Sequence, residues 1–206
     1  MKLLSTLAAT AGLCVAVPAL SATVTLDFEG QESFASINIP ANQYGIAANG
    51  ALLALVNDGF GSGLNGENFS NEPVSGSSVM FATQSLPGER AEISSTSGFN
   101  QSVSFYYSSS AAGSVVARDA SGAVVGQFDF AANSTNPDHP FNAWNIGTFL
   151  INGLAKSIDF SGAYVDGVGI AAFDNLTVNA VPLPGALLLL PSGLAMLGMM
   201  RRRKMV

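Results

Sequence analysis

The chain has 206 residues, of which 48% are hydrophobic and 11% are charged, and its formal net charge is −6. Most of the basic residues lie near the two ends, so residues 23–180 carry 14 acidic residues against three basic ones, a net charge of −11. A domain of that sign repels nucleic acid and anionic lipid, because both are bound through basic side chains. We therefore expect no nucleic-acid partner, whereas cation binding and simple solubility both fit the charge.

The N-terminus has the three parts of a secretory signal peptide. Lys2 is positive, residues 3–17 are apolar and contain no acid, and small residues follow up to Ala22. We expect export and cleavage after Ala22, with a cut after Ser21 as the alternative. The only cysteine, Cys14, lies in the apolar part, so the mature protein would have no cysteine for a disulfide or for thiolate chemistry.

Residues 23–180 make a single domain by length, and alternating apolar and polar residues predict β-strands throughout it. In Thr23–Glu29 the apolar residues share one face, and in Gln101–Ser108 serines and Tyr106 alternate with apolar residues. This pattern is typical of a sheet that is covered on one side. The other predicted strands are residues 51–56, 78–82, 90–94, 113–118, 123–130, 146–151, 156–160 and 168–178.

The segments between the predicted strands have turn and loop compositions. Asp119–Gly122 predicts a hairpin between the strands that flank it, and residues 57–78, rich in Gly, Asn and Ser, predict a long loop. No helical period occurs within the domain. We therefore expect an all-β fold, a two-sheet antiparallel sandwich of jelly-roll-like form.

Acidic residues at opposite ends of the domain are candidate ligands for a calcium ion. Asp27 and Glu29 close the first strand, and Asp174 lies in the last one, where the alternation places it on the apolar side. A carboxylate there must be met by a cation or a donor. Calcium would do so through carboxylates and carbonyls and would join the two strands. The alternatives are an ion pair with Arg90 or Arg118, and a turn in which the carboxylate caps the backbone.

The same two segments resemble the ends of galactose-binding-like jelly rolls. The residues concerned are Phe28-Glu29-Gly30 in the first strand and Asp174-Asn175-Leu176 in the last. The resemblance implies a jelly-roll fold and, as in several carbohydrate-binding modules of that kind, a structural calcium between the chain ends.

Two aromatic residues are candidates for sugar binding, because sugars present apolar C–H faces to aromatic rings. Trp144 is the only tryptophan and lies in a polar-flanked loop, and Tyr106 falls on the serine face of its strand. We expect a saccharide site at these two residues. The alternative is that Trp144 packs in the core, where its large area would stabilise whatever it covers.

The residues for catalysis are few, so we expect no enzyme. The only histidine, His139, lies between two prolines in a predicted turn, where a solvated side chain is the simpler interpretation. Glu89 and Glu92 beside Arg90 are the nearest pair of carboxylates of the kind that glycoside hydrolysis needs, and a solvated charge cluster explains them. A secreted glycan-active enzyme on a jelly roll remains the alternative.

Residues 181–206 have three parts in a fixed order. Val181-Pro182-Leu183-Pro184 precede an uncharged apolar segment, residues 185–200, and Arg201, Arg202, Arg203 and Lys204 follow it. The 20 uncharged residues from 181 to 200 would span about 30 Å as a helix, the thickness of a bilayer core. The basic patch would hold that end in the cytoplasm and the rest of the chain outside.

These parts resemble the PEP-CTERM sorting signal of exported bacterial proteins, although Leu183 stands where the family has Glu. The resemblance implies transient anchoring in the inner membrane and cleavage near the motif by an exosortase in bacteria that make exopolysaccharide. A permanent C-terminal anchor is the alternative.

We therefore expect a signal peptide (1–22), a domain (23–180) and a sorting signal (181–206) in a non-enzymatic surface or matrix protein. A binder of exopolysaccharide and a purely structural protein both fit.

Overall fold

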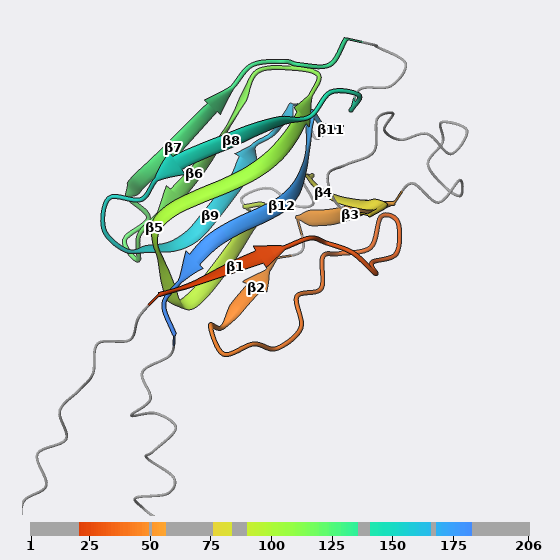
Figure 1. The fold of residues 1–206 in the computed structure, drawn as a ribbon. Coiled ribbons are helices and arrows are strands. Elements are labelled where there is room, and N and C mark those ends of the chain that lie inside the picture. Colours follow the sequence, from red (N-terminus) through yellow and green to blue (C-terminus); the bar gives the residue numbers. More distant parts are fainter. Residues whose placement is uncertain are drawn as a thin grey trace, which may run out of the picture.

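A computed structural model describes residues 21–49, 51–56, 76–83, 90–135, 141–165 and 168–182. This part of the chain forms strands and no helix, and all strand pairs are antiparallel, which confirms the predicted all-β class (Figure 1). It accordingly contains no helix able to span a membrane. Residues 1–20 and 183–206, with most of the predicted signal peptide and the whole predicted membrane helix, lie outside the described residues.

The strands, in chain order, are β1 (Ala22–Leu26), β2 (Ile46–Ala48), β3 (Leu52–Val56), β4 (Ser78–Ala82), β5 (Glu92–Ser109), β6 (Gly113–Arg118), β7 (Val124–Phe130), β8 (Asn145–Leu150), β9 (Ala155–Gly162), β10 (Tyr164–Val165), β11 (Val168–Gly169) and β12 (Ala171–Ala180). Most predicted strands recur with small shifts at their ends. Residues 90–94 and 101–108 belong to one long strand, β5, and the predicted strand 168–178 is divided into β11 and β12. The sequence did not predict β2 and β10, which are too short to show an alternation.

The sheet runs in the order β3-β4-β12-β5-β9-β6-β7, with β1 paired to β12 and with β2 and β8 paired to β5. The two halves of β5 have different neighbours: the first pairs with β2 and β9, the second with β8 and β12. Between them lie Gly98 and Gln101, with φ of 105° and 64°. A Cβ at Gly98 would come within 2.8 Å of the Ala155 carbonyl oxygen, so the bend requires glycine. In place of the expected pair of sheets, one ten-stranded sheet has two halves that share β5, and β10 and β11 form a small two-stranded sheet beside it.

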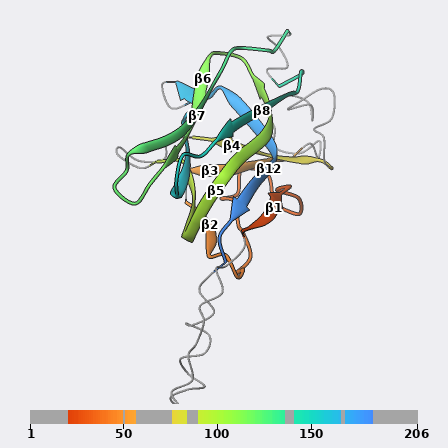
Figure 2. The ribbon, with the colours of Figure 1, turned by 60° about the vertical axis from the view of Figure 1, so that its left-hand side comes forward.

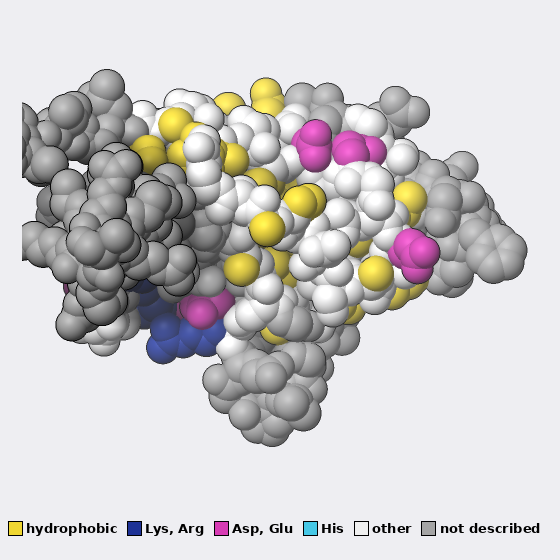
Figure 3. Space-filling view, turned by 90° about the horizontal axis from the view of Figure 1, so that it is seen from below, with side chains coloured by type: hydrophobic (Ala, Val, Ile, Leu, Met, Phe, Trp, Pro, Cys, Tyr) yellow, Lys and Arg dark blue, Asp and Glu magenta, His cyan; other side chains and the backbone are white. Residues whose placement is uncertain are grey.

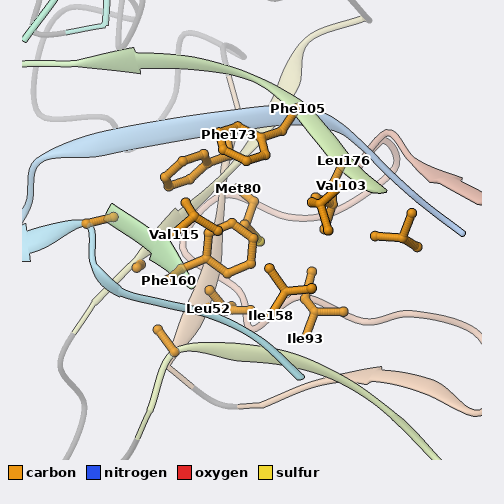
Figure 4. Close-up of a cluster of buried hydrophobic side chains, with 14 of the residues drawn as sticks. Leu52, Met80, Ile93, Val103, Phe105, Val115, Ile158, Phe160, Phe173 and Leu176 are labelled. Carbon is orange, nitrogen blue, oxygen red and sulfur yellow. The ribbon is translucent and has the colours of Figure 1, made fainter. Parts of the chain in front are cut away.

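The hydrophobic core lies between the two halves of this folded sheet. Figure 4 shows Phe105, Phe160 and Phe173 among its buried side chains. The rings of Phe160 on β9 and Phe173 on β12 lie 5.0 Å apart, although these strands are not hydrogen-bonded neighbours. The sheet therefore folds back over a shared aromatic core and has the two layers of a sandwich-like domain.

The predicted hairpin at Asp119–Gly122 is confirmed. Strands β6 and β7 pair on either side of it, and Gly122 has a φ of 84°. The Asp119 carboxylate accepts hydrogen bonds from the backbone N–H of Ser121 and Ala123 and from the Ser121 hydroxyl. The hydrogen bond from the Ser121 hydroxyl is the main cause that lowers the pKa of Asp119.

The two ends of the domain lie side by side. Strand β1 pairs with β12 from Ala22–Ala180 to Leu26–Leu176 (Figures 1 and 2). Next to the Ala22–Ala180 pair, the Val181 N–H donates to the Gly98 carbonyl oxygen. The first and last strands are thus joined directly by their backbones, and an ion is not needed to bring them together.

Candidate functional site

The two predicted sugar-binding residues lie near each other on one face of the sheet. Tyr106 stands opposite Asp174 of β12 on one side and Ile146 of β8 on the other. Trp144 comes two residues before Ile146 and packs near Ala172, which lies two residues before Asp174. Both aromatic side chains are half-buried. The structure therefore brings Tyr106 and Trp144, which are far apart in the sequence, to the outer surface of β5 and its two neighbours.

Trp144 also has a packing role. It covers a second, smaller hydrophobic cluster on this outer surface, made of Leu55, Val79, Phe141 and Ala172. The ring is thus partly a surface group and partly a cover for apolar side chains. A substitution of Trp144 would disturb both roles, so Tyr106 is the cleaner probe of ligand binding.

Asp174 is fully buried, as the alternation predicted, but on a different face from the one expected. A β-bulge between Asp174 and Thr177, with Asn175 at a φ of 49°, shifts the register. Leu176 and Val178 therefore face the main core, and Asp174 faces the opposite side with Tyr106. Its Oδ1 accepts a hydrogen bond from the Asn175 N–H at 2.7 Å. Capping of the backbone by this carboxylate was one of the alternatives to a calcium site.

Asp27 and Glu29 lie at the end of β1, where they line an open pocket of about 230 Å³ that Asp174 does not line. Both oxygens of Glu29 accept backbone hydrogen bonds, from Ser77 at 3.2 Å and from Ser78 at 3.0 Å. The described residues contain no group of three or more His, Cys, Asp or Glu side chains that could hold a metal. The predicted calcium ligands are thus not brought together there, and calcium stays a prediction.

In the view from below, acidic side chains lie at a few places on the surface, two of them close together and one beside basic side chains (Figure 3). Arg118, one of the predicted partners of Asp174, instead forms an ion pair with Asp159, with 2.9 Å between Nε and Oδ2. Burial alone would raise the pKa of Asp159, but hydrogen bonds from Ser161 and Arg118 outweigh it and lower the pKa.

Of the three side chains considered for catalysis, only Glu92 lies among the described residues. His139 and Glu89 lie outside the described residues, and Glu92 stands opposite Asp159 across the β5–β9 pair. Because the buried Asp159 carboxylate already accepts from Arg118 and from the Ser161 N–H, it is held as a structural anion.

The predicted processing motif begins where the described strands end. The Val181 N–H donates to Gly98, and its carbonyl oxygen accepts a hydrogen bond from the Ser97 hydroxyl. Pro182 is the last described residue, and the remainder of the motif and the basic patch lie beyond it.

No protein-family model and no curated protein matches the chain. Among solved structures, the K2 cleaved adhesin domain of Lys-gingipain is similar at a TM-score of 0.47 and 15% identity, over 77% of this chain and 99% of that domain. A family 43 arabinoxylan arabinofuranohydrolase from Bacillus subtilis, in complex with cellotetraose, has a TM-score of 0.40 and 14% identity, over 71% of this chain and 29% of the enzyme. An arabinose-bound α-L-arabinofuranosidase has a TM-score of 0.42 and 12% identity, over 78% of this chain and 26% of the enzyme. Similarity at this level assigns no function.

Proposed function

We propose that the protein is an exported, non-enzymatic surface or matrix protein whose jelly-roll-like domain associates with exopolysaccharide. The observation that carries the binding part is the placement of Tyr106 and Trp144 on one outer face of the sheet. An aromatic ring beside hydroxyl and amide side chains offers a sugar both an apolar platform and hydrogen-bond partners. The sequence of the two chain ends supports export through the inner membrane, transient anchoring, and release to the cell surface or matrix.

The binding part predicts that the purified protein is retained by a neutral polysaccharide in affinity electrophoresis and releases no reducing ends from it. Tyr106→Ala is expected to weaken retention about two- to twelvefold, because an aromatic contact is worth about 0.5–1.5 kcal/mol. Tyr44→Ala is the matched control, since Tyr44 is also half-buried and packs against the main core rather than on this face. Release of reducing ends would favour a glycan-active enzyme, and equal effects of the two variants would remove Tyr106 from the site.

The processing part predicts the mass of the secreted form. We expect it to lack everything beyond about Pro184, and we expect deletion of residues 201–204 to prevent anchoring and correct cleavage, because the basic patch orients the segment. Intact mass spectrometry of the protein in the medium measures both. Secreted protein that still contains residues 196–204 would show that no exosortase-type enzyme removes the C-terminus.

A further inference from the structure

The outer face of four neighbouring strands carries an array of uncharged side chains. In Figure 1, β8, β5, β12 and β1 lie side by side in that order, as their hydrogen-bonded register requires. We call this array the hydroxyl face; its residues are Thr23, Thr25, Ser102, Ser104, Tyr106, Ile146, Thr148, Leu150, Thr177 and Asn179. All ten are half-buried or exposed.

Cross-strand pairing aligns these residues in rows that run across the sheet. One row joins Thr25, Thr177, Ser104 and Thr148, one residue from each strand. Within it, the Thr25 and Thr177 hydroxyl oxygens lie 2.9 Å apart. Because neighbouring strands are about 4.8 Å apart, such a row spans about 14 Å.

A second row lies beside the first and is also tied together by side chains. The Thr23 hydroxyl donates to the Asn179 amide oxygen at 3.2 Å, and the Asn179 amide nitrogen donates to the Ser102 hydroxyl oxygen at 3.2 Å. Leu150 completes the row on β8. These bonds hold the polar side chains in fixed positions, while each hydroxyl keeps further capacity to donate or accept.

The ten side chains of the hydroxyl face carry no charge, and Asp174, which stands opposite Tyr106 on the same side of β12, is fully buried. Elsewhere, outward strand positions carry Asp129 on β7, Glu92 on β5 and Lys156 on β9. A neutral ligand can therefore dock without removing a charge from water, whereas a charged ligand finds no opposite charge there. Two apolar side chains are also unusually open, with Ile146 61% and Leu150 75% exposed.

We propose that the hydroxyl face is the docking surface for an extended, neutral polysaccharide that lies across the four strands. This inference rests on the proposed function and deepens it by naming the ligand class and the mode of contact. Tyr106, Ile146 and Leu150 contact the C–H faces of the sugars, and the threonine, serine and asparagine side chains hydrogen-bond their hydroxyl groups. Each contact is small, so affinity is gained along the length of the chain.

The test is the affinity of the purified protein for a neutral oligosaccharide series of increasing length, measured by calorimetry. Affinity is expected to rise until the ligand spans about 14 Å, the width of the four strands. Thr23→Asp and Thr148→Asp, at exposed positions on opposite edges of the face, are expected to weaken binding of the longest ligand about tenfold. Thr148→Asn, which matches Asp in size, is expected to weaken it much less, and Ala120→Asp, in the exposed β6–β7 turn, not at all.

The thermal midpoint of each variant is compared with that of the wild type, so that a loss of affinity can be told from a loss of fold. If both face aspartates leave affinity unchanged while Tyr106→Ala lowers it, binding across the four strands is overturned, and the proposed function stands with a site at Tyr106 and Trp144. If the wild-type protein binds no neutral glycan, both fail. Affinity that saturates with a monosaccharide and is lost in Asp27→Asn would move the site to the pocket beside β1. A dimer that Thr148→Asp dissociates, without glycan binding, would make the face a contact between copies of the chain.

Discussion

Phe173→Ala is expected to lower the free energy of unfolding by about 3–5 kcal/mol, a large part of the total stability of a domain of this size. Phe173 is fully buried, and its ring contacts those of Phe105, Phe130 and Phe160 at centroid distances of 5.5, 6.0 and 5.0 Å. These rings come from different strands in both halves of the folded sheet. The substitution leaves a cavity at the place where the two layers meet.

Urea denaturation measures this loss, and Phe34→Ala is the control. Phe34 is 48% exposed and makes an edge contact with Phe81, so its loss is expected to cost far less. Equal changes in the two variants would contradict the placement of Phe173 at the centre of the core. The slope of unfolding free energy against urea concentration is expected to be the same in both variants and in the wild type. An unchanged slope would show that all three unfold from an equally compact state.

Arg118→Ala is expected to cost about 3 kcal/mol at neutral pH, the lower end of the range for a broken buried ion pair. The substitution leaves the carboxylate of Asp159 buried without its arginine, and that residue is only 3% exposed. Because the fold lowers the pKa of Asp159, its contribution to stability is present above the unfolded pKa of about 3.9 and is lost as the pH falls through the folded pKa.

The difference between wild type and Arg118→Ala is therefore expected to be largest at pH 7 and to shrink below about pH 4, as the carboxyl group becomes protonated. Urea denaturation at both pH values measures it. Arg90→Ala, at an exposed position, is the matched control and should be near neutral at both. A cost for Arg118→Ala that does not change with pH would mean that lost packing of the arginine stem, rather than the charge of Asp159, dominates.

The alternation of apolar and polar residues predicted strands such as β1, β6 and β8, because each of them has one covered face. Strands β3, β4 and β9 are buried at successive positions and were predicted from short apolar runs instead. It missed the places where the period of two is interrupted. Residues 98–101 bend β5 through two positive φ angles, so one strand looked like two. The bulge at Asn175 reversed the face of Asp174, and no local pattern announces such an insertion.

The candidate site was predictable in its parts and not in its arrangement. The serine face of β5 and the placement of Tyr106 on it, away from the main core, followed from local alternation. The partners of that face come from β1, β8 and β12, and the Thr25–Thr177 contact alone joins residues 152 positions apart. Such a register depends on long-range pairing that a single strand does not specify. The same limit explains why Asp27, Glu29 and Asp174 looked like one site.

The most direct measurement of the central claim is a map of backbone amide chemical shifts during titration with a neutral oligosaccharide long enough to cross the four strands. The account predicts that the perturbed amides belong to β1, β12, β8 and the second half of β5, with the largest changes around Tyr106 and Thr148. It predicts little change in the β6–β7 hairpin. Perturbations confined to that hairpin or to the pocket beside β1, or none at any concentration, would contradict it.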